Sequence, residues 1–142
     1  MAAFVKYNAY IDEIAKAGHN HATAVFKLAL TNTAPGAADT VWNTTVAPAP
    51  AAANGYPAGG NTLTTSSAAT ASSIFKLVLA DTVFTATAGG IGPFRYALLY
   101  NSSSSPVNKL LGYYDYGSSI TLADTETFTT DFDAANGVLT IS

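Results

Sequence analysis

The first part of the chain has the hydrophobic period of a helix. Tyr7, Tyr10, Ile11 and Ile14 follow the i, i+3, i+4, i+7 spacing that places side chains on one helical face, and charged residues occupy the opposite face. Gly18 is suited to the residue after the helix, because glycine readily adopts a left-handed backbone conformation. The pattern predicts an amphipathic helix over residues 6–17, whose apolar face closes one end of the fold.

After this helix the hydrophobic period changes to two, the period of a β-strand. The segments VFKLALTN (25–32) and IFKLVLAD (74–81) are near copies, each with large apolar residues on one face and a lysine, Lys27 or Lys76, on the other. Two copies with different flanks do not make a repeat architecture, which needs at least three units. We interpret them as half-buried strands in similar environments, with neighbouring strands as one arrangement. Each lysine is expected to face solvent, where charge opposes edge-to-edge pairing.

Strand signals crowd together in the second half of the chain. The expected strands cover residues 83–88, 94–101, 109–116, 118–122, 126–133 and 138–141. Phe128 and Phe132 are expected to point inward, and Asn136-Gly137 predicts a tight hairpin that pairs the last two strands. About eight short strands separated by turns indicate an all-β, antiparallel β-sandwich, with a jelly roll as the leading arrangement and one N-terminal amphipathic helix.

The segment 43–60 is rich in Ala, Pro, Gly and Asn and is predicted to be an extended loop or arm, followed by a short strand at 61–66. Two interpretations stay open, a surface loop and an arm that grips a partner protein. The second makes Pro48, Pro50, Tyr56 and Pro57 candidate interface residues.

Composition narrows the classes of function. The 142 residues are expected to form a single domain, 1–142, without disulfides, because the chain has no cysteine. Charged residues make up 11%, against about 25% in typical proteins, so the surface is mostly small and neutral and suits contact with another protein. A net charge of -3 with six basic residues argues against nucleic-acid binding. Neither a secretory signal nor a membrane-spanning run is expected.

Few residues suggest chemistry. His19-Asn20-His21 offers two imidazoles without a third ligand nearby, so a polar loop is favoured over a metal site. Asp131 and Asp133 share a strand face and could bind calcium or act as paired carboxylates, but solubilising charges that dock on a basic partner patch are favoured. The serines lie in no nucleophile motif, and GGIGPF is interpreted as a turn. We therefore expect no enzyme activity, no metal and no cofactor.

The aromatic strip GYYDYG divides its side chains between two strand faces. Tyr114 and Tyr116 share one face, and Tyr113 and Asp115 share the other, so one tyrosine is expected to face outward. Tyrosine is enriched at protein interfaces. Tyr113 and Asp115 therefore join the candidate interface, although tyrosines that fill the sandwich and its rim remain the alternative.

Several of these motifs together are familiar. The amphipathic start, the FKL strand, NGYPAGGNTLT, GPFRYALLYN, LLGYYDYGSSITL and ETFTTDFDAANGVLTI resemble a family of small virion proteins of tailed bacteriophages, and within it the capsid cement, or decoration, proteins. The resemblance implies a structural virion protein, made in the host bacterial cytoplasm, that binds the outside of the capsid and clamps neighbouring major capsid subunits. It also implies a homo-oligomer, and low charge with strand edges in need of cover favours a dimer.

One alternative function is a receptor- or carbohydrate-binding β-sandwich module of a head or tail fibre, since such modules also expose tyrosines. Copy number distinguishes the two, because cement proteins are far more numerous on a particle than fibre components. A glycoside hydrolase that uses Asp131 and Asp133 is disfavoured.

Overall fold

The computed structural model describes residues 2–43 and 50–142. Within these residues the chain forms antiparallel β-strands and one short helix, as the sequence predicted for an all-β fold. The elements are β1 (Phe4–Lys6), α1 (Asn8–Ala15), β2 (Phe26–Thr31), β3 (Asn61–Thr62), β4 (Thr65–Ala71), β5 (Ile74–Leu79), β6 (Thr82–Thr85), β7 (Ile91–Asn101), β8 (Lys109–Leu122), β9 (Thr127–Thr130) and β10 (Leu139–Ile141).

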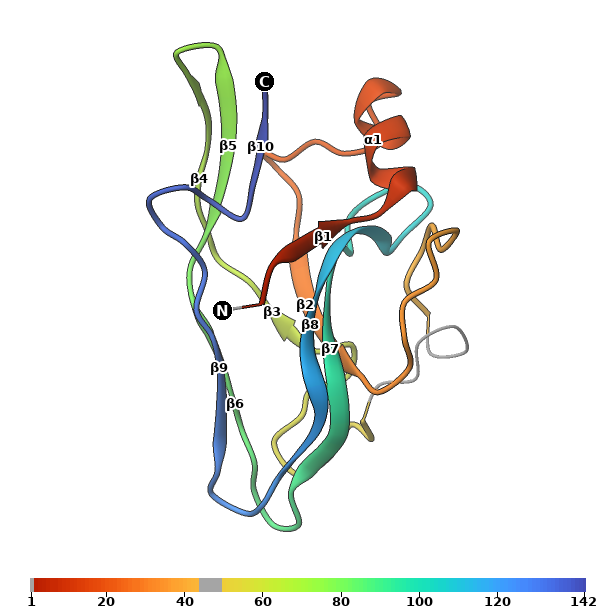
Figure 1. Cartoon of the computed structure of the whole chain (residues 1–142), viewed down its shortest axis with the longest axis vertical. Coiled ribbons are helices and arrows are strands. Elements are labelled where there is room, and N and C mark those ends of the chain that lie inside the picture. The colour runs from red at the N-terminus through yellow and green to blue at the C-terminus, as the bar shows by residue number, and fades with distance from the viewer. Residues whose placement is uncertain (1, 44–49) are drawn as a thin grey trace.

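The strands lie in two layers (Figure 1). One layer is a five-stranded sheet in the order β1-β8-β7-β2-β3. The other layer, on the left of Figure 1, holds a three-stranded sheet, β10-β5-β4, above a two-stranded sheet, β6-β9. Aromatic side chains join the layers, for example Phe94 of β7 with Phe128 of β9, whose ring centroids are 5.0 Å apart.

The strand pairs of the second half of the chain are nested. β7 pairs with β8, β6 pairs with β9, and β5 pairs with β10, all antiparallel. The predicted hairpin between the last two strands is therefore wrong, because β9 and β10 each pair with an earlier strand. The Asn136-Gly137 turn instead redirects the chain from β9 towards β5. Asp133 holds this turn by accepting hydrogen bonds from the backbone N–H groups of Ala135 and Asn136.

The two FKL copies, β2 and β5, are not neighbours, since they lie in different layers. What they share is a central place, because each has a strand partner on both sides. Their lysines are half-buried and do not simply face solvent. Lys27 Nζ donates to the carbonyl of Ala58, and Lys76 Nζ donates to the carbonyl of Ala135. Each lysine thus ties a loop to the middle of a sheet.

The loop after residue 49 packs on the domain. Tyr56 is only 3% exposed, stacks on Phe84 of β6, and accepts a hydrogen bond from the backbone N–H of Leu30. Tyr56 therefore belongs to the core and is not available as a surface contact. Pro50 is half-buried, Pro57 is exposed, and Pro48 lies outside the described residues.

The strand predicted at 61–66 divides into two. Asn61–Thr62 pairs with β2, and the chain then crosses to the other layer to form β4. The strands predicted at 109–116 and 118–122 are one strand, β8.

The helix is shorter than predicted, because Phe4–Lys6 pairs with β8 as a strand and Tyr7 keeps an extended backbone before the helix begins. At its end Ala17, and not Gly18, takes the left-handed conformation, with φ of 57°. The N–H of Gly18 donates to the carbonyl of Glu13, and the N–H of Ala17 donates to that of Ile14, which satisfies two terminal carbonyls.

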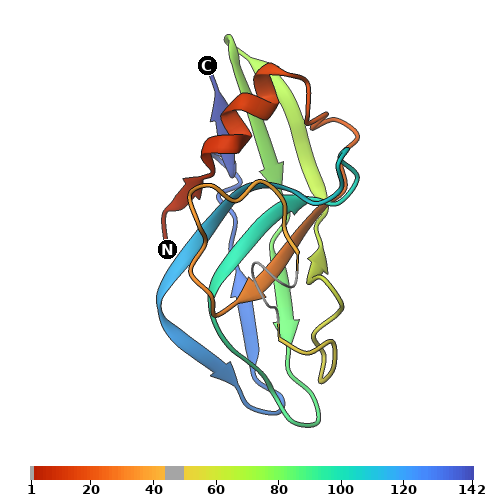
Figure 2. The ribbon, with the colours of Figure 1, turned by 90° about the vertical axis from the view of Figure 1, so that its right-hand side faces the viewer.

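The helix lies across the upper end of the layers (Figure 2). Tyr10 is 1% exposed and Ile14 packs against the core, as expected. Ile11 is 58% exposed, so its predicted burial is wrong. Of the predicted apolar face within the helix, only Tyr10 and Ile14 contact the core.

The different burial of Tyr10 and Ile11 predicts different losses of stability when each is substituted. Tyr10→Ala should lower the free energy of unfolding by about 3–5 kcal/mol, because it opens a cavity and removes the partner of His21. Ile11→Asp should change it by less than about 1 kcal/mol, because the new carboxylate stays in water. Urea denaturation of both variants checks this, and comparable losses in the two would contradict the placement of the helix.

Candidate functional site

A cleft opens between the two layers where β8 faces β9. It has a volume of about 340 Å³ and is lined by Ala2, Ala97, Tyr114, Tyr116, Phe128, Thr129, Thr130 and Asp131. We call it the aromatic cleft. Tyr114 and Tyr116 come from β8, and Phe128 to Asp131 come from β9 and the residue that follows it. Aromatic rings and polar groups thus converge from opposite strands, a common composition for ligand sites.

A bulge in β8 shapes this cleft. Between the pairs Tyr96↔Asp115 and Phe94↔Ile120, β7 has the single residue Arg95 whereas β8 has residues 116–119. Gly117 makes the bulge possible with φ of 90°, a conformation that other residues rarely adopt. The bulge leaves Tyr116 58% exposed, with its ring edge-on to Phe128 at 5.8 Å. Bulges beside functional sites often redirect a side chain in this way.

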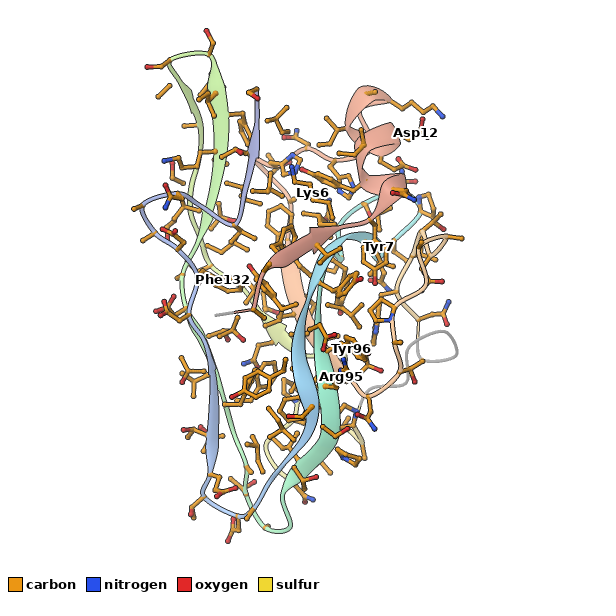
Figure 3. All side chains as sticks on the ribbon, viewed as in Figure 1. Lys6, Tyr7, Asp12, Arg95, Tyr96 and Phe132 are labelled. Carbon is orange, nitrogen blue, oxygen red and sulfur yellow. The ribbon has the colours of Figure 1, made fainter. Side chains whose placement is uncertain are left out.

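Charges near the cleft are partly neutralised. Arg95 on β7 donates from Nε and Nη2 to the two carboxylate oxygens of Asp115, at 2.7 and 2.9 Å. Its guanidinium also lies 5.2 Å from the ring centroid of Tyr96. Arg95 and Tyr96 are labelled in Figure 3. The hydrogen bonds from Arg95, and a further one from the Gly117 N–H, lower the pKa of Asp115. Asp131 is exposed at the cleft and forms no ion pair with any described residue.

The hydroxyl groups of the cleft differ in their surroundings. Burial raises the pKa of Tyr114 to about 12, so its phenol stays protonated at neutral pH. Thr130 is 9% exposed, and its buried Oγ1 has no hydrogen-bond partner among the residues of the structure. A buried polar atom without a partner costs about 1–3 kcal/mol, which a donor from a ligand could offset.

Exposure along the tyrosine strip does not follow the alternation, because Tyr113 and Tyr114, which were assigned to opposite faces, are both half-buried and Tyr116 is exposed. Tyr113 is half-buried between Tyr7 and Tyr96, with ring centroids at 5.5 and 6.3 Å, and Asp115 is held by Arg95. Tyr116 is the outward tyrosine. The sequence placed Tyr114 and Tyr116 on one face but did not include them among the interface candidates, because the partner strand that completes the cleft, β9, is not visible in the local pattern.

Asp131 and Asp133 both line a second, open depression of about 550 Å³, together with Asp81. Asp81 accepts a hydrogen bond from the N–H of Phe132, and Asp133 is committed to the turn that precedes β10. The hydrogen bonds from Asn136 lower the pKa of Asp133. Nowhere in residues 2–43 and 50–142 do three His, Cys, Asp or Glu side chains gather as a metal site would require.

His19 and His21 lie in the loop between α1 and β2, as predicted, but their side chains are buried. They are 7% and 8% exposed, and their ring centroids are 5.8 Å apart. His21 Nε2 lies 3.0 Å from the Tyr10 hydroxyl, and His19 Nδ1 lies 3.4 Å from the amide nitrogen of Asn101. Burial, with smaller contributions from His21 and Lys109, lowers the pKa of His19 to about 4. Both rings therefore serve packing as neutral groups at pH 7.

Comparisons with known proteins give no family: no family model, no curated protein and no solved structure matches this chain. Within the part of the chain that the structure describes, no helix is long and apolar enough to cross a membrane.

The buried histidines predict a loss of stability in mild acid. The pKa of His19 is about 4 in the folded chain against an ordinary 6.5, so the unfolded chain binds its proton first as the pH falls. The free energy of unfolding should fall by up to about 3 kcal/mol between pH 6.5 and pH 4, with no further loss from this group below pH 4.

Urea denaturation at a series of pH values measures this loss, with His19→Gln as the control. The difference between parent and variant isolates His19 from the carboxylates that titrate in the same range. A difference that does not change with pH would show that His19 is not buried as a neutral ring.

Proposed function

We propose that this chain is a non-enzymatic structural protein of a tailed-phage virion, a cement protein that binds the outer capsid surface and clamps neighbouring major capsid subunits. The observation that carries the proposal is a surface with few charges and many large apolar side chains. The exposed ones are Val5, Ile11, Val25, Ile74, Val83, Val107 and Tyr116. With charged residues at only 11%, little charge repulsion opposes broad contact with a large partner surface.

The strand arrangement supports a jelly-roll type of sandwich. In the nested order, β6 and β9 enclose the β7–β8 hairpin, and β5 and β10 enclose both pairs. Jelly rolls wind an antiparallel ribbon of this kind into two layers. A rigid two-layered domain of this type can present the same surface at every site of a lattice.

Cementing follows from mass action. A protein that binds the assembled shell but not the free subunits stabilises the shell by RT ln(1 + [L]/Kd) at each occupied site. Many weak contacts therefore suffice. Exposed Tyr116 is the one observation that favours the alternative, a receptor- or carbohydrate-binding module of a head or tail fibre.

Copy number on the particle is the test. Quantitative mass spectrometry of purified particles should find this chain at a stoichiometry comparable with the major capsid protein, on the order of hundreds of copies, because cementing repeats at each lattice site. Added protein should also raise the temperature at which undecorated shells break open. A few copies per particle would favour the fibre module, and absence from particles would refute a virion role.

We also infer a homo-oligomer, with a dimer favoured. In the described sheets β1, β3, β4, β6, β9 and β10 each pair on one side only, and such edges are usually covered. The prediction is a dimer in sedimentation equilibrium of the purified protein at tens of micromolar. A monomer at that concentration would show that the edges are protected within one chain.

A further inference from the structure

We propose that the aromatic cleft binds the guanidinium group of an arginine side chain that a partner protein presents. This inference deepens the proposed function and rests on it for the identity of the partner, the capsid surface. The binding chemistry itself follows from the cleft alone and can be tested without particles.

The first argument is the ring arrangement. Tyr114, Tyr116 and Phe128 line a cleft of about 340 Å³, at the small end of the range for ligand sites, about 300–1,000 Å³. The face of an aromatic ring attracts a cation, and most strongly where water is excluded. The bulge of β8 keeps the ring of Tyr116 at the cleft instead of in the core.

The second argument is charge. Asp131 lines the cleft and has no cationic partner in the described part of the chain. The nearby guanidinium, that of Arg95, already pairs with both oxygens of Asp115. The sequence has no Lys or Arg after Lys109, so the strands from β8 to β10 add only negative charge beyond it. The cleft therefore attracts a cation and repels an anion.

The third argument separates arginine from other cations. A guanidinium is flat, stacks on aromatic rings and carries several N–H donors in one plane, whereas an ammonium is a compact point charge. Among the residues that line the cleft, Asp131 and Thr130 carry oxygen acceptors, and Tyr114, Tyr116 and Phe128 carry aromatic rings. A flat group with donors along its edge and apolar faces can use both kinds of group together.

The chain already contains one instance of this chemistry. Arg95 lies over the ring of Tyr96 and makes a two-pronged contact with Asp115, next to the cleft. The proposed site would repeat the same combination of guanidinium, aromatic ring and carboxylate, with the arginine supplied by another chain. Arginine and tyrosine are also the residues that dominate binding energy at protein interfaces.

Small probes test the chemistry directly. N-acetyl-L-arginine amide, its neutral isostere N-acetyl-L-citrulline amide, choline and methyl α-D-glucoside are titrated into the isotope-labelled protein, and the ring signals of Tyr114, Tyr116 and Phe128 are followed by NMR. The arginine probe should shift these signals saturably and bind about tenfold more tightly than the citrulline probe. Added salt should weaken it, because the contact is partly ionic.

Three variants locate the site. Asp131→Asn and Thr130→Val are isosteric, and Tyr116→Leu replaces the ring by a smaller apolar side chain; each should weaken binding of the arginine probe several-fold. Asp12→Asn is the matched control for charge, because Asp12 is an exposed carboxylate on α1. Val107→Ala is the control for an exposed apolar residue. Neither control should change binding, and thermal melts confirm that all five variants are folded.

The contrary outcomes are distinct. Equal binding of arginine and citrulline probes would overturn the role of charge, and tighter binding of choline would assign the cleft to quaternary ammonium ligands. Saturable shifts with the glucoside alone would assign it to carbohydrate, and no ring shifts with any probe would overturn the site. Each of these results leaves the cement proposal to be decided separately by copy number.

Discussion

The burial of β2 and β7 on both faces is the constraint on which the rest of the structure depends. Phe26, Leu28 and Leu30 are fully buried in the core, and so is Ala29 on the opposite face of the same strand. The second layer covers one face of this sheet, and the loop segments before β3 cover the other face. Trp42 stacks on Tyr100 of β7, with ring centroids 4.9 Å apart, and the carbonyl of Gly59 accepts a hydrogen bond from the Tyr100 hydroxyl. The segment rich in Ala, Pro and Gly thus has a structural role in the residues that are described, because small residues let its backbone approach the sheet. Gly60 shows how close, since a Cβ there would lie 1.8 Å from the carbonyl oxygen of Leu28.

The same constraint explains the position of the charged groups. A lysine on a strand covered from both sides must find an acceptor, and Lys27 finds the carbonyl of Ala58 in the covering loop. Lys109, at the start of β8, is 6% exposed and is paired with Glu13 of α1, which ties the helix to the sheet. Such a pair is weak evidence for stability, because removing two charges from water is costly. It does fix the position of α1, since an unpaired Lys109 or Glu13 would be expensive to bury.

The sequence predicted those features that depend on residues close together in the chain, and it missed those that depend on distant residues. Alternation and the helical period are local, and they predicted the all-β class, most of the strands and the burial of Tyr10, but not β1 or most of β4. Strand partners are not local, and this is why the Asn136-Gly137 hairpin failed: Phe128 on β9 pairs with Phe84 on β6, and Leu139 on β10 pairs with Leu77 on β5. The lysines were misplaced for a related reason, because alternation identifies two faces of a strand but not whether a distant loop covers the second. Tyr116 was recognised as a possible outward residue, whereas the cleft around it depends on a bulge and on β9.

The aromatic cleft exists because β8 is longer than its neighbours can cover. β1 pairs with β8 only from Gly112 to Tyr114. Residues 116–119 of β8 have no regular partners on β7, because the bulge interrupts the pairing there. A free, flat strand edge invites pairing with another chain, and a bulge prevents this by turning the edge outward. The bulge in β8 therefore both protects this strand edge and exposes Tyr116. A surface with so few charges has few directional contacts with which to fix its orientation on a partner, since apolar contacts are not directional. A single geometrically specific anchor at the bulge would supply the orientation, while the scattered apolar residues supply contact area.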